Sequence, residues 1–158
     1  MENQHQKFMQ LAIELSEQNV KEGLGGPFGA VIVKDGEIIA ATGNTVTTTN
    51  DPTAHAEIAA IRIACKKLNT FSLEGCIIYA SCEPCPMCLG AIYWARIDKL
   101  YYANTKKDAA KIGFDDHFIY QEIALEPSNR NLQTQQIMRS EALEAFSLWK
   151  KSCNKTDY

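Results

Sequence analysis

The chain has 158 residues, 46% hydrophobic and 22% charged, with a formal net charge of −3. This length suits one domain that buries about 68–70% of the surface its unfolded chain exposes. No apolar run approaches the ~20 residues of a membrane span, and the N-terminal residues lack the basic and apolar regions of a signal peptide. We therefore expect a cytoplasmic protein of a single domain, 1–158. The scattered lysine pairs form no basic stripe, which argues against a nucleic-acid partner.

The first half of the chain predicts a helix followed by a hairpin. Apolar residues at a 3.6-residue period, ending at Val20, predict an amphipathic helix over about 6–22. Two short apolar runs, 28–33 and 37–41, flank an Asp-Gly pair, which is typical of a tight hairpin turn. Residues 43–53 are rich in Asn and Thr and are expected to form a loop.

The second half continues the alternation of helices and strands. Asp51 and Pro52 suit the N-cap and first position of a helix that runs to Leu68. The remaining predictions are, in chain order, a strand over 76–80, a helix over about 85–95, a strand over 100–103, helices near 107–112 and over 140–151, and a fifth strand over 132–138. Such alternation predicts an α/β fold with a sheet covered by helices.

Two short motifs carry the chemistry of the chain. The fragments His55-Ala56-Glu57 and Pro84-Cys85-Pro86-Met87-Cys88 offer three zinc ligands, His55, Cys85 and Cys88. A structural zinc site is usually closed by four protein ligands, whereas a catalytic site leaves one position for water. Glu57 is then the candidate general base beside that water, and Zn²⁺ is the expected cofactor. The pairing of H-x-E with P-C-x-x-C is the signature of zinc-dependent nucleobase deaminases.

The spacing of these residues constrains where the metal lies. Cys85 and Cys88 share one face of a helix, whose N-terminus lowers thiol pKa values. His55 and Glu57 are two residues apart and project to nearly opposite sides of a helix. Both reach one metal only if it lies beyond the helix end. We therefore predict the metal at the helix cap.

Less specific interpretations remain for the cysteines. A Cys-x-x-Cys pair also occurs in redox sites and in structural half-sites. Cys82 is close enough in sequence to complete a four-ligand structural site with His55, Cys85 and Cys88. In that case the protein is a zinc-stabilised interaction module without turnover. Retention of zinc after substitution of Cys82 distinguishes the catalytic site from the structural one.

The chain resembles the cytidine-deaminase-like superfamily and, more narrowly, its bacterial guanine deaminases. The segments that carry the resemblance are Gly25–Ala30, Asn50–Glu57, Ser81–Cys88, Gly90–Arg96, Gly113–Asp116 and the terminal Tyr158. The resemblance covers roughly residues 8–122. It implies a three-layer α/β/α fold with a central mixed sheet of about five strands, and one Zn²⁺ per subunit. It also implies conversion of guanine and water to xanthine and ammonia, and a homodimer in which segments of about 124–158 can be exchanged.

The resemblance also implies contacts with a purine base. Phe28 and Trp94 would wall the base, and Asn44 would hydrogen-bond its polar edge. Asp116 would accept from the N–H groups of guanine, and Tyr158 would close a pocket, that of the neighbouring subunit. Each has an ordinary structural alternative: core packing for the two aromatic residues, a turn for Asn44, a solvated acid for Asp116 and a frayed terminus for Tyr158.

Other activities share the metal motif. A tRNA adenosine deaminase has the same motif and fold, but usually adds a basic RNA-facing surface. A cytosine or nucleoside deaminase also remains open, since the metal motif alone does not rank pyrimidine against purine. Guanosine is a further candidate, because the residues do not reveal whether ribose fits.

Overall fold

The computed structural model describes residues 2–158, which divide into two compact units. The first unit ends at Asp116 and contains the sheet, and the second comprises His117–Tyr158. Across residues 2–158, none of the helices combines the length and apolar character needed to cross a membrane.

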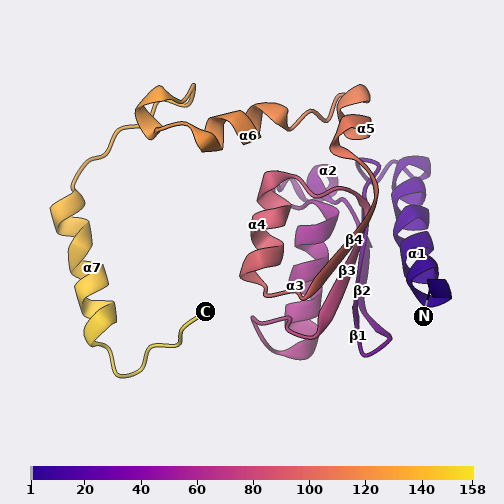
Figure 1. Cartoon of the computed structure of the whole chain (residues 1–158), viewed down its shortest axis with the longest axis horizontal. Helices are drawn as coiled ribbons and strands as arrows, with labels where there is room; N and C mark the ends of the chain where they lie inside the picture. Colours follow the sequence, from indigo (N-terminus) through magenta and orange to yellow (C-terminus); the bar gives the residue numbers. More distant parts are fainter. Residues whose placement is uncertain (1) are drawn as a thin grey trace. The chain divides into compact units, whose positions relative to one another are not determined.

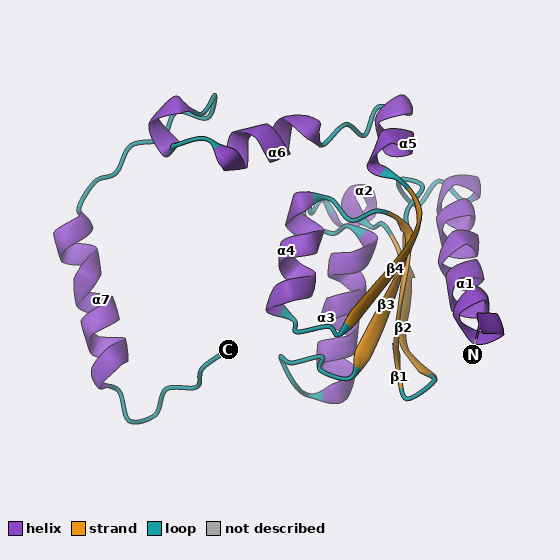
Figure 2. Ribbon diagram, viewed as in Figure 1, coloured by secondary structure: helices purple, strands orange, loops and turns teal. Residues whose placement is uncertain are grey.

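The first unit is built on a mixed sheet of four strands in the order β2-β1-β3-β4 (Figure 2). Their bounds are β1 (Gly29–Lys34), β2 (Glu37–Gly43), β3 (Cys76–Cys82) and β4 (Lys99–Asn104). Strand β1 pairs antiparallel with both β2 and β3, whereas β3 and β4 run parallel. The mixed sheet is confirmed, but the predicted number of about five strands is wrong.

Helices cover both faces of this sheet, as Figure 1 shows. Helix α1 (Glu2–Lys21) lies on one face, and α3 (Ala56–Leu68) and α4 (Pro86–Trp94) lie on the other. Alternate residues of β1 point to the two faces, so Val31 packs with Phe8 of α1 while Ile32 packs with Ala60 of α3. Both faces are therefore buried, and the predicted three-layer α/β/α architecture is confirmed.

The predicted hairpin joins β1 to β2 through Asp35 and Gly36. Both residues have positive φ, 51° and 82°, which a two-residue turn of the type I′ class requires. Glycine adopts such φ values without steric cost, which explains its place in this turn.

The start of α3 differs from the prediction. The helix begins at Ala56 with His55 as its N-cap, not at Asp51. Asp51 instead accepts a hydrogen bond of 2.8 Å from the backbone N–H of Thr53, which forms a local turn ahead of the helix. The predicted loop over 43–53 contains a short helix, α2 (Val46–Thr49).

The second unit holds α6 (His117–Ala124), a 3-10 turn (Pro127–Asn129) and α7 (Arg139–Lys151), while α5 (Lys106–Lys111) belongs to the first unit. Helix α7 matches the helix predicted over 140–151. The prediction of a fifth strand over 132–138 is wrong, since this segment is irregular. A strand needs a neighbour for its backbone hydrogen bonds, and the described residues of this unit include only helices and irregular segments.

Candidate active site

The three predicted metal ligands lie together at the ends of two helices. His55 is the N-cap of α3 and Cys85 is the N-cap of α4, with Cys88 in the first turn of α4. His55 Nδ1 is 3.6 Å from the sulfur of Cys85 and 3.5 Å from the sulfur of Cys88. His55 makes no side-chain cap bond, because its ring faces the two thiols. This arrangement agrees with a metal beyond the helix end.

The distances in this group suit zinc. Zn–S bonds of about 2.3 Å and Zn–N bonds of about 2.0–2.1 Å at a tetrahedral angle separate sulfur from nitrogen by about 3.6 Å. Within residues 2–158, His55, Cys85 and Cys88 are the residues whose ligand atoms lie within 4.8 Å of one another in a group able to hold a metal. The donor set and its dimensions therefore fit one Zn²⁺ per subunit.

Cys82 has different partners. Its thiol is buried and lies 3.7 Å from the backbone carbonyl oxygen of Thr105, to which it donates. Burial, with a smaller contribution from the charge of Glu57, raises the pKa of the Cys82 thiol to about 11. A neutral thiol that already donates elsewhere is a poor zinc ligand. These observations favour three protein ligands over a closed four-ligand site.

The ligand group stabilises a thiolate. A hydrogen bond from the Cys88 thiol lowers the pKa of Cys85 to about 4. Burial opposes this decrease, and a hydrogen bond with His55 adds to it. The hydrogen bond between the two cysteines raises the pKa of Cys88, and the hydrogen bond with Cys85 raises the pKa of His55. One negative sulfur is therefore available at neutral pH before any cation binds, as a zinc site requires.

Glu57 lies in the first turn of α3, two residues after His55, and is 8% exposed. Burial raises the pKa of its carboxyl group, and a hydrogen bond from the backbone is the largest effect that opposes this rise. A carboxyl group with a raised pKa takes up and gives back a proton more readily near neutral pH. The carboxyl group thus has the environment expected of a general acid–base residue beside the ligand group.

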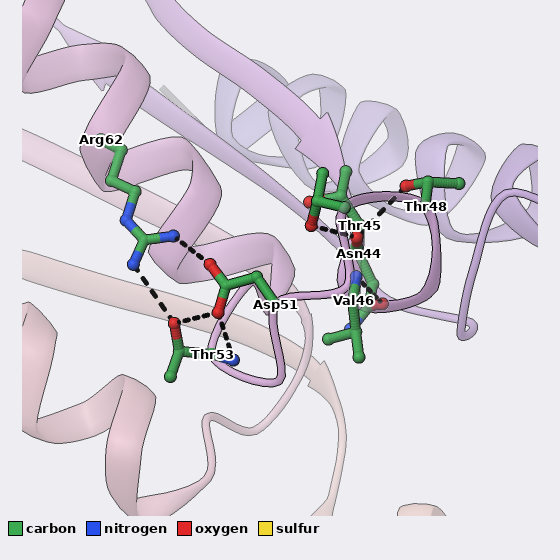
Figure 3. A network of polar contacts seen from close by, with 8 residues as sticks. Asn44, Thr45, Val46, Thr48, Asp51, Thr53 and Arg62 are labelled. Carbon is green, nitrogen blue, oxygen red and sulfur yellow. Dashed lines mark hydrogen bonds and ion pairs between the residues drawn. The ribbon is translucent and has the colours of Figure 1, made fainter.

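Two of the predicted substrate residues are joined by the backbone. The N–H of Asn44 donates to the carbonyl oxygen of Phe28 over 3.0 Å. Asn44 is buried, and its side-chain oxygen accepts from the N–H of Val46 over 3.1 Å (Figure 3). Phe28 is half-buried and meets Phe114 edge-on, with ring centroids 4.9 Å apart. The side-chain amide of Asn44 is thereby oriented with its oxygen engaged, which leaves donation as the role of its NH₂ group.

Trp94 and Asp116 also belong to the first unit. Trp94 ends α4, is 70% exposed and lines an open hollow with Gly90, Tyr93 and Arg96. Asp116 is partly buried, and burial followed by the charge of Cys85 raises the pKa of its carboxyl group. Asp116 is therefore within electrostatic reach of the ligand group.

Tyr158 is the last residue of the second unit and is 69% exposed. The substrate roles of Tyr158, Trp94, Asp116, Phe28 and Asn44 stay predictions.

Asn19 organises this region, although the sequence patterns did not single it out. Asn19 is buried on α1, and its Nδ2 donates to the carbonyl oxygens of Gly26 and Asn44, each over 2.8 Å. The sequence did contain an indication that Asn19 is buried. It lies at helical spacing from Phe8, Ala12 and Leu15, on the apolar face of the helix. Val20, assigned to that face, is instead 55% exposed.

The chain is similar to a family with a zinc-binding deaminase region and to a guanine deaminase, in agreement with the ligand group of the site. Residues 2–104 match the family described as the cytidine and deoxycytidylate deaminase zinc-binding region. The chain is 54% identical to guanine deaminase of Bacillus subtilis over 154 residues, which are 98% of this chain and 99% of that protein. The X-ray structure of that protein gives a TM-score of 0.95 over 98% of both chains.

A second relative matches over a shorter length. The tRNA-specific adenosine deaminase of Aquifex aeolicus is 44% identical over 100 residues, 63% of this chain and 66% of that protein. The tRNA-specific adenosine deaminase of Buchnera aphidicola matches 98% of this chain and 93% of its own length, but at 34% identity. Over both units, the chain is therefore more similar to guanine deaminase, at 54% identity. The chain belongs to the cytidine-deaminase-like superfamily and, within it, to the bacterial guanine deaminases.

Proposed function

We propose that this chain hydrolyses guanine to xanthine and ammonia. The observation that carries the proposal is a three-ligand group, His55, Cys85 and Cys88, beside a buried carboxyl group, Glu57. Likeness to guanine deaminase over 98% of the chain supports guanine as the base.

The ligand group and Glu57 have separate tasks. His55, Cys85 and Cys88 would hold Zn²⁺, which when bound would supply Lewis acidity that lowers the pKa of a water molecule. Two thiolate ligands make this effect weaker than three neutral nitrogen ligands do, so a base is needed. Glu57 accepts a proton from the attacking water and transfers it to the ring nitrogen next to the amine-bearing carbon. Glu57 then moves the proton of the hydroxyl group now on that carbon to the amine. The C–N bond breaks, ammonia leaves and the hydroxyl oxygen becomes a carbonyl oxygen of xanthine.

Selection of guanine depends on its hydrogen-bonding edge. Guanine presents N1–H and the exocyclic amine side by side, both as donors, whereas adenine has no N1–H. Asp116, which is partly buried, accepts from this edge, and bound adenine would leave this acceptor unpaired, which penalises adenine. Asn44 donates from its NH₂ group to an acceptor of the base. Phe28 and Trp94 contact the faces of the ring.

The active protein is a homodimer, and Tyr158 closes the pocket of the partner subunit. Support comes from α7, on which the apolar side chains of Phe146, Leu148 and Trp149 are 74%, 61% and 46% exposed in a single chain. A second copy would remove these side chains from water. In this proposal the segments of about 124–158 are exchanged between the two copies, and each copy contributes one deaminase domain. Light scattering on purified protein should give twice the chain mass.

The cytoplasm is the expected compartment. All six cysteines are free thiols, which suits a reducing environment. Cell fractionation followed by immunoblotting tests this.

An ammonia-release assay tests the activity. Purified zinc-loaded protein is incubated with guanine, guanosine, adenine, cytosine, cytidine and a tRNA anticodon stem. We expect release from guanine, identified by xanthine as the product, with adenine at the level of a protein-free control. Activity confined to the RNA, or to the pyrimidines, would reject the proposal.

A further inference from the structure

The position of His55 depends on the turn that precedes it. An N-cap side chain ordinarily bonds the first turn of its helix, but that of His55 makes no such bond. The backbone instead holds this residue: the N–H of His55 donates to the carbonyl oxygen of Thr53 over 2.8 Å, and that of Ala54 to Asp51 over 3.0 Å. The direction of the imidazole ring thus follows from the geometry of the turn Asp51–Ala54.

Side chains lock this turn to the flank of α3, as Figure 3 shows. The carboxylate of Asp51 accepts from the N–H of Thr53 over 2.8 Å and from its hydroxyl over 2.6 Å. Arg62, on α3, donates from Nη1 to Asp51 over 3.0 Å and from Nη2 to the Thr53 hydroxyl oxygen over 3.2 Å. These bonds form a closed ring of contacts between the turn and the helix that follows His55.

Global stability does not explain this network. The Arg62 side chain is 57% exposed and that of Asp51 35% exposed, and ion pairs open to water contribute little to folding. The geometry has a different consequence. The planar guanidinium of Arg62 donates to Asp51 and to the Thr53 hydroxyl at once. Two such bonds fix both the distance and the orientation of the turn relative to α3. A flexible turn would let the ring of His55 leave its place 3.5–3.6 Å from the two sulfurs.

We propose that Asp51, Thr53 and Arg62 are positioning residues that set the orientation of the His55 ring before zinc binds. None of the three belongs to the ligand group. They act on His55 through the backbone of the turn. The inference rests on the proposed zinc site, and it adds a reason why the ligand group is assembled in advance. A preassembled site binds more tightly because less ordering accompanies binding.

Zinc affinity, measured by competition with a chromogenic chelator, tests the proposal. We expect Thr53→Val and Arg62→Ala to weaken zinc binding by about 10-fold or more, as for other residues that orient a metal ligand. Thr53→Ser keeps the hydroxyl and should stay within about twofold of wild type, while Arg62→Lys, which retains charge but not the fork, should lie between Arg62→Ala and wild type. Lys21→Ala removes a comparably short exposed ion pair, 2.9 Å to Glu17, and serves as the control.

Two further readouts separate positioning from a loss of folding. The unfolding temperature of the metal-free protein should change no more in Thr53→Val than in Lys21→Ala. The absorption bands of the cobalt-substituted protein, which report coordination geometry, should shift in Thr53→Val and not in Thr53→Ser. Equal zinc affinity in wild type, Thr53→Val and Arg62→Ala overturns the proposal. Failure of the wild-type protein itself to bind zinc overturns the proposed function instead.

Discussion

The side-chain amide of Asn19 donates to the backbone carbonyl of Asn44 over 2.8 Å, across 25 residues of sequence. The same nitrogen donates to the carbonyl of Gly26. The oxygen of this amide lies against the backbone of Gly43. A Cβ at Gly43 would be 2.6 Å from Asn19 Oδ1, so glycine at this position lets the amide lie this close to β2. One buried side chain of α1 thereby holds the two loops that carry the predicted substrate residues Phe28 and Asn44.

Replacement of Asn19 should be costly for folding. Asn19→Ala removes a donor from the carbonyl groups of Gly26 and Asn44, of which Gly26 still accepts from the N–H of Phe28. We expect a loss of about 1–3 kcal/mol in the free energy of unfolding. Urea denaturation followed by circular dichroism measures it. The neighbouring Gln18 bonds only to the exposed Glu22 among the contacts described, so Gln18→Ala should change stability by less than about 0.5 kcal/mol. Equal effects of the two substitutions would contradict the role of Asn19.

Cys82 and Cys85 should differ in their importance for zinc. We expect Cys82→Ala to retain one zinc per chain, because the Cys82 thiol bonds to Thr105 and lies outside the ligand group. Cys85→Ala should lose the metal, since two protein ligands remain. Metal analysis after gel filtration measures both. Zinc-free Cys82→Ala in a folded protein would indicate a closed structural site.

Glu57 should matter for turnover and not for metal content. Glu57→Gln keeps the shape of the side chain but cannot accept a proton, so kcat should fall by roughly 10²–10⁴ or more. The zinc content should equal that of wild type. Steady-state kinetics with guanine, together with metal analysis of the same sample, provides the measurement. Full activity in Glu57→Gln would reject Glu57 as the base.

The metal-free protein should carry an unusually acidic thiol. The pKa of Cys85 is lowered to about 4, mainly by the Cys88 thiol. The Cys85 thiolate is therefore present above that pH and lost below it, so iodoacetamide should still modify Cys85 at pH 6. An ordinary cysteine, with a pKa of about 8.5, reacts little there. Mass spectrometry locates the adduct, zinc should protect Cys85, and the exposed Cys153 is the internal comparison.

Stability at alkaline pH should depend on Tyr79. Its phenol is buried between α1 and the sheet and bonds to His5 Nδ1 over 2.7 Å. Burial raises the pKa of Tyr79. The neutral phenol of Tyr79 therefore stabilises the folded state. This stabilisation is complete below pH ~10, the pKa of tyrosine in the unfolded chain, and is lost as the pH rises through the higher pKa of the folded state. Between pH 9 and 11, wild type should therefore lose stability more steeply than Tyr79→Phe in urea denaturation. Parallel slopes would contradict this assignment.

Local patterns in the sequence were sufficient to pick out the candidate ligand group and much of the architecture. The structure brings His55, Cys85 and Cys88 together because each motif spans only a few residues at a helix start. The role of Glu57 stays a prediction. The Asp35-Gly36 hairpin was also found from a local pattern, since positive φ at two adjacent residues is a local requirement. The fifth strand failed because a short apolar run over 132–138 does not reveal whether a neighbouring strand exists.

Contacts between distant segments were decided only by the tertiary structure. Asn19 meets Asn44, and Arg62 closes a ring with Asp51 and Thr53, because packing of α1 and α3 on the sheet determines which side chains come within bonding distance. Capping preference likewise favoured Asp51 over His55 as the start of α3, although His55 occupies that position. Sequence periodicity specifies a face of a helix, but hydrogen bonds across layers require the relative placement of whole elements.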